Sequence, residues 1–246
     1  MVNSKVEYKM RYKVLTLMLL SSFFAKAQEL EFTGKLSGLQ KNTKVILTDL
    51  RSLKANSPEQ RFHDTALVSD GLFKFKTVLP GAGMYLLRVA LIGQNPEHRK
   101  FYLDGGKVQL EGKRGGLNKA TLSSDAKYMK DFVLFTDIMD RPEVFARRKA
   151  LKDTAMMRMA ETGSYDGYFN SPGLRERMSK VEKEAIAKAM EIAMNWIVEY
   201  PNSDINAYVI HTFLRSKTSD KIVKDAIAKL SPSARRSFPG KMLINL

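Results

Sequence analysis

The chain has no cysteine among its 246 residues. Disulfide bonds, thiolate metal sites and dithiol redox chemistry are therefore excluded for these residues, because each of them needs a cysteine sulfur. Lipid attachment through a lipobox is excluded for the same reason, since that motif requires a cysteine after the signal. The sequence predicts a protein that is not a lipoprotein and has no thiol chemistry of its own.

Residues that commonly carry metal binding or acid–base catalysis are also scarce. The three histidines, His63, His98 and His211, are far apart in the sequence and lie on different predicted elements. His63 stands beside Asp64, and a carboxylate can orient an imidazole, so a metal or acid–base role is conceivable there. No third partner is identifiable, and ordinary strand or loop residues are the favoured interpretation. We predict no catalytic, cofactor-binding or metal-binding residue, no cofactor, and no enzymatic activity.

The sequence has a short apolar run where a membrane helix would need a long one. Val14–Phe24 has 11 residues, against roughly 20 for a span. Basic residues precede it, and Ala25-Lys26-Ala27 follows as an A-x-A cleavage site. We predict a Sec-type signal peptide over residues 1–27, cleaved after Ala27, and a periplasmic or otherwise exported mature protein without a stable membrane span. A retained membrane anchor is the alternative.

The start of translation and the net charge of the mature protein are both linked to the predicted signal peptide. Met10 opens a more compact basic segment than Met1, so we expect translation to start at Met10. The formal charge of the chain is +15, and removal of residues 1–27, with five basic residues and one acidic residue, leaves +11 on 219 residues. In an exported protein this charge favours anionic lipid head groups or polysaccharide over nucleic acid. A plain solvated basic surface is the other interpretation.

Residues 28–123 are predicted to form an antiparallel β-sandwich. The clearest sign is the Asp70-Gly71 pair between alternating apolar runs, because Asp-Gly supplies the positive φ angles of a two-residue hairpin turn. Alternation places Phe73 and Phe75 on one face. The near-continuous apolar run Met84–Leu91 predicts a central strand covered on both faces. Residues 120–122 are expected to add a last edge strand.

Residues 124–246 are predicted to be all-helical, because the apolar period changes to three or four residues. We expect five helices stacked as helical hairpins, so that the fold class is α+β. Pro142 starts the second helix, and Pro201 stops the strongest one, Leu174–Tyr200. Ser219 caps the last helix, with Ile222 facing inward. The other candidate caps are Ser123 or Ser124, and Asn202 or Ser203.

Three further groups of residues are candidates for a binding or catalytic site. The loop Gly112–Gly116 is glycine-rich and basic but lacks the ordered phosphate-loop pattern, so phosphate binding is not expected. The alternating acidic and basic residues of the strongest helix are typical of a solvated surface. An aromatic platform for sugar or peptide is conceivable in the loop before this helix, although partial burial is the favoured interpretation. The residues are Glu176, Glu182, Glu184 and Glu191 on the helix, and Tyr165, Tyr168 and Phe169 in the loop.

Several short motifs follow one another along the chain, and their order is informative. They are Phe32-Thr-Gly34-Lys-Leu-Ser-Gly38, Asp64-Thr65-Ala-Leu-Val68-Ser-Asp70-Gly71-Leu-Phe73-Lys-Phe75, Tyr85-Leu-Leu-Arg-Val, Phe101-Tyr-Leu-Asp-Gly-Gly-Lys-Val108-Gln-Leu, Tyr200-Pro201-Asn202-Ser203, and the run from Leu230-Ser231-Pro232 to Gly240-Lys241. This order resembles the β-rich domain of unknown function 4369 and the helical spacer after it in Bacteroidota TlpA/ResA-like thiol–disulfide oxidoreductases. The resemblance covers most of residues 29–246.

The resemblance implies a function only in part. In that family a thioredoxin-like domain with a Cys-x-x-Cys pair follows the spacer, and these 246 residues contain no such pair. Redox activity is therefore not carried over to any residue here. We expect an exported, non-catalytic protein that binds an envelope protein or a small ligand, and that could present a substrate to a separate redox partner. The alternative is a truncated relative of the oxidoreductases without its catalytic domain.

Overall fold

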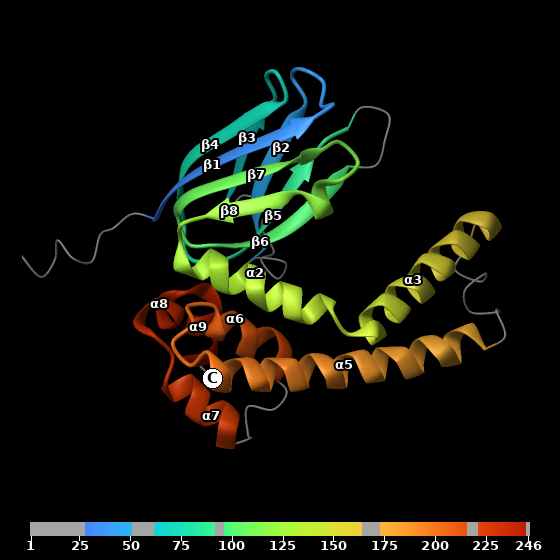
Figure 1. The fold of residues 1–246 in the computed structure, drawn as a ribbon, viewed down its shortest axis with the longest axis vertical. Helices are drawn as coiled ribbons and strands as arrows, with labels where there is room; N and C mark the ends of the chain where they lie inside the picture. Colours follow the sequence, from blue (N-terminus) through green and yellow to red (C-terminus); the bar gives the residue numbers. More distant parts are fainter. Residues whose placement is uncertain (1–27, 51–61, 92–95, 164–172, 216–220, 245–246) are drawn as a thin grey trace, which may run out of the picture.

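The computed structural model describes residues 28–50, 62–91, 96–163, 173–215 and 221–244. Two β-sheets come first in the chain and helices follow, so the fold class is α+β, as the sequence predicts (Figure 1). The predicted signal peptide, its cleavage site and Met10 lie outside the described residues. No helix of the described ranges combines the length and the apolar character needed to cross a bilayer.

Each sheet has four strands. Sheet A has the order β4-β1-β7-β8, and sheet B has the order β3-β2-β5-β6. All neighbouring strands are antiparallel except β1 and β7, which are parallel; β7 follows the turn after β6 of sheet B. The strands are β1 (Gln28–Ser37), β2 (Lys44–Asp49), β3 (His63–Leu67), β4 (Leu72–Leu79), β5 (Gly83–Val89), β6 (Glu97–Leu103), β7 (Gly106–Lys113) and β8 (Thr121–Ser124).

The predicted Asp-Gly turn is present, but it does not join two paired strands. Asp70 and Gly71 have φ angles of 52° and 74°, and Ser69 and Leu72 exchange two backbone hydrogen bonds of 2.8 Å. Beyond this bridge the chain separates, since β3 belongs to sheet B and β4 to sheet A. The predicted hairpin is therefore a corner that carries the chain from one sheet to the other.

Aromatic side chains from both sheets fill the sandwich. Phe73 and Phe75 share the buried face of β4, as their alternation predicts. Phe32 of β1 lies between them and sheet B, with its ring centroid 5.7 Å from that of Phe101 on β6. Gly34 on β1 lies under the ring of Phe73, and a Cβ atom at this position would overlap the ring. Glycine is therefore required there by packing.

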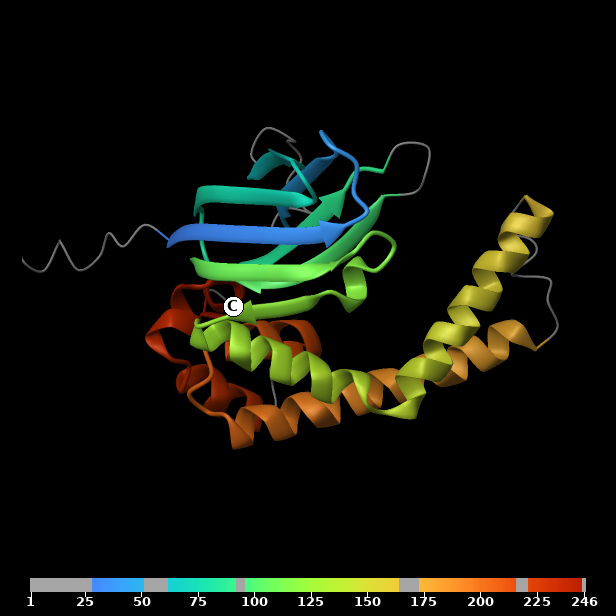
Figure 2. The same ribbon diagram turned by 45° about the horizontal axis from the view of Figure 1, so that its top comes forward.

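Strand β5 is an interior strand of sheet B, as predicted, but it is buried on one face only. Tyr85 and Leu87 are buried, whereas Leu86 is half-buried and Arg88 is exposed. The predicted cover on both faces is wrong, because the helices gather at one edge of the sandwich and leave most of this face to solvent (Figure 2).

Among the described residues, the helical part contains the five predicted helices and two short ones that the sequence patterns did not predict, α8 and α9. Helix α3 and the N-terminal part of α5 form an arm that extends away from the rest of the molecule, while the C-terminal part of α5 packs into the core (Figure 1). The elements are η2 (Leu117–Lys119), α2 (Lys127–Asp140), α3 (Glu143–Thr162), α5 (Leu174–Glu199), α6 (Asn206–Val209), η3 (Ile210–Leu214), α7 (Lys221–Ala228), α8 (Pro232–Arg236) and α9 (Phe238–Ile244).

The structure confirms the predicted ends of two helices, but the predicted caps Ser124 and Ser203 are wrong. Helix α3 begins just after Pro142, and α5 ends just before Tyr200-Pro201. Ser124 does not cap α2, because its Oγ accepts the N–H of Ala126 before the helix begins. Ser203 does not cap α6, since its hydroxyl donates to Asp131 of α2. Ser219 lies outside the described residues, and Ile222, expected to face inward, is 50% exposed.

The sandwich and the helices share one hydrophobic core. Strand β6 ends in three consecutive buried residues, Phe101, Tyr102 and Leu103. Phe101 packs inside the sandwich, while the ring of Tyr102 lies about 6 Å from the rings of Tyr128 on α2 and Tyr208 on α6. Period-two alternation breaks at this point because helices cover the outer side of the strand end.

Candidate functional site

A concave site among the described residues lies between strand β8 and helix α2. Strand β8 is the last strand of sheet A, as the sequence predicts for this segment. After it the chain turns, and α2 runs back along the strand (Figure 1). Ser124 fixes this turn, because its hydroxyl donates to the carbonyl of Lys107 at 2.7 Å and its Oγ accepts the N–H of Ala126 at 3.1 Å. The strand and the helix are thus held as the two walls of one groove.

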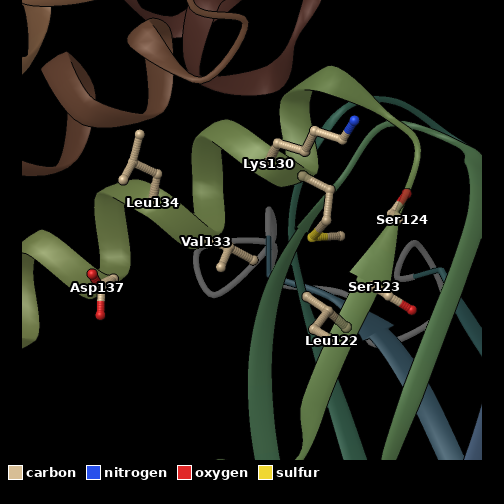
Figure 3. Close-up of a pocket in the computed structure, with 8 residues that line it drawn as sticks. Leu122, Ser123, Ser124, Lys130, Val133, Leu134 and Asp137 are labelled. Atoms are coloured by element: carbon tan, nitrogen blue, oxygen red, sulfur yellow. The ribbon is translucent and has the colours of Figure 1, made fainter.

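The groove has a volume of about 480 Å³ and is mainly apolar on its inner surface. Figure 3 shows Val133 of α2 and Leu122 of β8 facing each other across it. Strand β8 has no further strand beside it among the described residues. The lining residues are Leu122, Ser123, Ser124, Met129, Lys130, Val133, Leu134 and Asp137.

The apolar residues of the helix wall lie off the stripe that α2 packs against the core. Phe132 and Phe135 are buried in that stripe, whereas Val133 is 40% exposed and Leu134 is 38% exposed. Met129 is 1% exposed and supports the floor of the groove. Sequence reasoning missed this site, although two apolar residues beside a complete helical stripe were a usable signal.

Charged residues mark the two ends of the helix wall. Lys130 and Asp137 are both exposed and both line the groove. They are seven residues apart on α2, which places them about 10 Å apart along the helix axis. The groove therefore has a cation at one end, a carboxylate paired with Arg141 at the other, and apolar side chains between them.

An edge strand beside an apolar groove is suited to binding an extended polypeptide. The outer edge of such a strand presents backbone N–H and C=O groups that another strand can pair with. In recognition by strand addition, these bonds supply affinity, and pockets for alternate side chains supply specificity. No proton transfer or nucleophilic attack is needed for this chemistry.

The structure does not bring the three histidines together. His63 lies on β3 and His98 on β6, which are the two edge strands of sheet B and are therefore about 14 Å apart. His211 lies in η3, where its Nε2 atom is 3.4 Å from Arg215. Asp64 follows His63 on the same strand, so their side chains point to opposite faces. An acid–base pair of these two residues is not formed.

The glycine-rich loop is organised by a carboxylate of the chain itself. The backbone N–H groups of Gly115 and Leu117 donate to the carboxylate of Glu97, at 2.7 Å and 2.9 Å. Arg99, two residues later on β6, donates to the carbonyls of Leu117 and Ala120. These N–H groups, which would have to receive a phosphate, are already bonded to Glu97.

The glutamates of α5 are only partly a solvated surface. Glu182 accepts two hydrogen bonds from Arg148 of α3, at 2.6 Å and 2.7 Å, and Glu184 forms an ion pair of 3.0 Å with Arg147. The predicted solvated face is therefore wrong at these two positions, because α3 packs against them. Glu191 pairs within α5 with Lys188. Tyr165, Tyr168 and Phe169 lie outside the described residues.

A second polar cluster lies where the β6–β7 turn meets the helices. Partial burial, and to a lesser extent the nearby Asp204, raise the pKa of Asp104 to about 6, with Arg236 acting in the opposite direction. Asp204 accepts a hydrogen bond from Ser231 before α8 at 3.1 Å, and the hydroxyl of Tyr128 donates to the carbonyl of Gly105. These bonds hold the turn against the helices, so we interpret the cluster as a joint between the two parts of the fold.

Comparisons with family models, with curated proteins and with solved structures found no match to this chain. The resemblance to the β-rich domain and spacer of the oxidoreductases stays a prediction.

Proposed function

We propose that this chain is an exported, non-catalytic binding protein of the cell envelope, and that it binds an extended segment of a partner protein between β8 and α2. The observation that carries the proposal is the position of the groove. Its apolar inner surface lies directly beside an edge strand. One ligand can therefore pair with the backbone of the strand and bury its side chains in the groove.

The dimensions of the strand set the size of the bound segment. Strand β8 has four residues, which corresponds to about 13 Å of extended chain. A bound strand of four to five residues would place alternate side chains over Leu122 and Val133. Lys130 favours a segment with an acidic residue near one end, because opposite charges then meet on docking, whereas Asp137 is already paired with Arg141.

The envelope location and the accessory role follow from the sequence. The predicted signal peptide places the mature chain outside the cytoplasm, and the resemblance assigns it to a region that accompanies thiol–disulfide oxidoreductases. A chain without cysteine can contribute binding surfaces to such a system but no electron exchange through its own residues. A partner or substrate protein of the envelope is therefore the ligand class that we propose.

The test is a peptide array of eight-residue segments with alternating apolar residues, in which every binding sequence is measured again in solution by fluorescence anisotropy. We expect Val133→Asp to weaken the bound peptides at least tenfold, because it places a carboxylate on the apolar wall. Peptides with N-methyl groups at alternate residues should lose binding as well, since they cannot complete the backbone ladder.

Val78→Asp is the matched control. Val78 lies on β4, the other edge strand of sheet A, and is 54% exposed, so the same substitution is made on the same sheet away from the groove. Equal weakening by both variants, or an array without any binding peptide, contradicts the proposal. A concentration-dependent dimer that Val133→Asp abolishes would assign the groove to a second copy of the chain instead.

A further inference from the structure

The outer face of sheet B differs in its charge from the outer face of sheet A. Strand alternation defines it, and the helices lie at an edge of the sandwich and leave most of it open (Figure 2). We call this surface the basic face. Its residues away from the helices are Lys44, Ile46, Thr48, His63, Thr65, Leu67, Leu86, Arg88, His98 and Lys100.

Within the described strands, the basic face carries positive charge without carboxylates beside it. Lys44, Arg88 and Lys100 are all exposed. In the strand register Arg88 lies between Ile46 and His98, and Lys100 lies opposite Leu86. No aspartate or glutamate occurs among the described residues of this face, since Asp49 and Asp64 belong to the opposite side of their strands.

The outer face of sheet A provides the contrast. Its lysines stand among glutamates, and Nζ of Lys74 lies 2.6 Å from the carboxylate of Glu31. Glu31 also lies opposite Lys76 and Lys107 in the register of the two neighbouring strands. The positive charges of sheet A are therefore partly neutralised within the sheet, and those of the basic face are not.

Apolar side chains are interleaved with the cations of the basic face. Leu67 is 56% exposed and lies opposite Lys44, while Ile46 and Leu86 are half-buried between the basic residues. This combination suits a membrane interface, where cations meet anionic head groups and apolar side chains enter the boundary with the acyl chains. A soluble polyanion would use the cations only.

We propose that the basic face binds the surface of a membrane rich in anionic lipid. The sheet presents its cations and its apolar side chains on one side of four neighbouring strands, so they can meet a lipid surface together. The inference goes beyond the peptide-binding function and does not depend on it, because β8 belongs to the other sheet. A chain bound in this way keeps its groove free for a partner.

The expected effect follows from the number of basic residues. A basic residue near an anionic membrane surface strengthens binding about fivefold. Removal of the charges of Lys44, Arg88 and Lys100 together is therefore expected to weaken binding about 100-fold. Binding should also fall as salt is added, because the attraction is screened over the Debye length.

The test is co-sedimentation of the full chain with vesicles of phosphatidylcholine alone and with vesicles of equal parts phosphatidylcholine and phosphatidylglycerol. Residues 1–27, with their apolar run and the basic residues before it, are the same in the parent chain and in every variant, so the comparison between variants removes their contribution. We expect preferential binding to the anionic vesicles, lost in the triple variant Lys44→Gln, Arg88→Gln, Lys100→Gln. Each single variant should lose about fivefold.

The matched control is Lys35→Gln, Lys76→Gln, Lys107→Gln on the outer face of sheet A, which makes the same change in net charge. Circular dichroism at increasing temperature checks that both triple variants fold. Equal loss in the two triple variants would mean that net charge alone attracts the chain, which overturns the proposal. The proposal is also overturned if the chain shows no preference for the anionic vesicles. It is overturned as well if the chain binds dextran sulfate and Leu67→Ser changes neither this binding nor the binding to vesicles.

Discussion

The indole N–H of Trp196 donates a hydrogen bond of 3.0 Å to Oδ1 of Asn206 across the turn between α5 and α6. Asn206 is 3% exposed, and its Nδ2 atom donates to the carbonyls of Tyr200 and Pro201, at 2.8 Å and 3.0 Å. One buried amide thus satisfies a side-chain donor of α5 and two backbone acceptors of the turn. It determines the direction in which the chain leaves the long helix.

Replacement of this amide should destabilise the protein strongly. Asn206→Ala leaves the buried indole N–H and two carbonyls without their partner, so we expect a loss of about 2–3 kcal/mol in the free energy of unfolding. Urea denaturation followed by tryptophan fluorescence measures it. Asn195→Ala, at an exposed position of α5, is the control and should change stability by less than about 0.5 kcal/mol. Similar losses in both variants would contradict the role of Asn206.

Gly34 should tolerate no side chain while Phe73 is present. The ring of Phe73 occupies the space of a Cβ atom at position 34, so Gly34→Ala is expected to cost about 1–3 kcal/mol through overpacking. Phe73→Leu removes part of the ring and should relieve the clash. A double-mutant cycle by urea denaturation measures the coupling, and additive losses would show that the two positions do not interact in this way.

The strands could be predicted from the sequence, but their partners could not. Alternation alone predicts that Phe73 and Phe75 share a face, and Asp70-Gly71 has the conformation that its residue types favour. Neither pattern indicates that β4 pairs with β1 instead of β3, because pairing depends on contacts between residues far apart in the sequence. For the same reason, the sequence does not predict that β1 and β7 pair in parallel.

The candidate groove was predictable only in its parts. The edge position of β8 and the apolar residues Val133 and Leu134 off the helical stripe are visible in the sequence. Their meeting in one groove depends on the angle at which α2 leaves Ser124, which packing against Tyr102 and its neighbours decides. Similarly, Ser203 looks like a helix cap by residue type, but the nearby Asp131 of α2 accepts its hydroxyl hydrogen bond at 2.6 Å.

The pair of Arg148 and Glu182 should hold the arm together. It is bidentate and joins α3 to α5, but both side chains are partly exposed, so we expect Glu182→Gln to cost about 0.5–1 kcal/mol. The reversed pair Arg148→Glu, Glu182→Arg should recover part of that loss. Chemical denaturation at low and high salt measures both effects. The comparison is Asp153→Asn, which breaks the exposed pair with Lys149 within α3 and should have a smaller effect.

Stability should decrease as the pH rises through the pKa of Asp104. Burial and the charge of Asp204 raise this pKa from 3.8 to about 6 in the folded chain. The folded state therefore holds the proton more tightly than the unfolded state does, and this contribution is fully present below pH 3.8 and lost as the pH passes about 6. Because the carboxyl is partly exposed to solvent, we expect a change of about 1 kcal/mol.

Asp104→Asn isolates this contribution, because an amide stays neutral at every pH. The variant should be more stable than the parent chain at pH 7 by about 1 kcal/mol, and the difference should vanish or reverse near pH 4. Thermal unfolding at a series of pH values measures both curves. Asp125→Asn changes an exposed carboxylate just before α2 and should leave the pH dependence of unfolding as it is in the parent chain. If Asp104→Asn instead lowers stability equally at pH 4 and pH 7, the raised pKa of Asp104 is not the cause of the pH dependence.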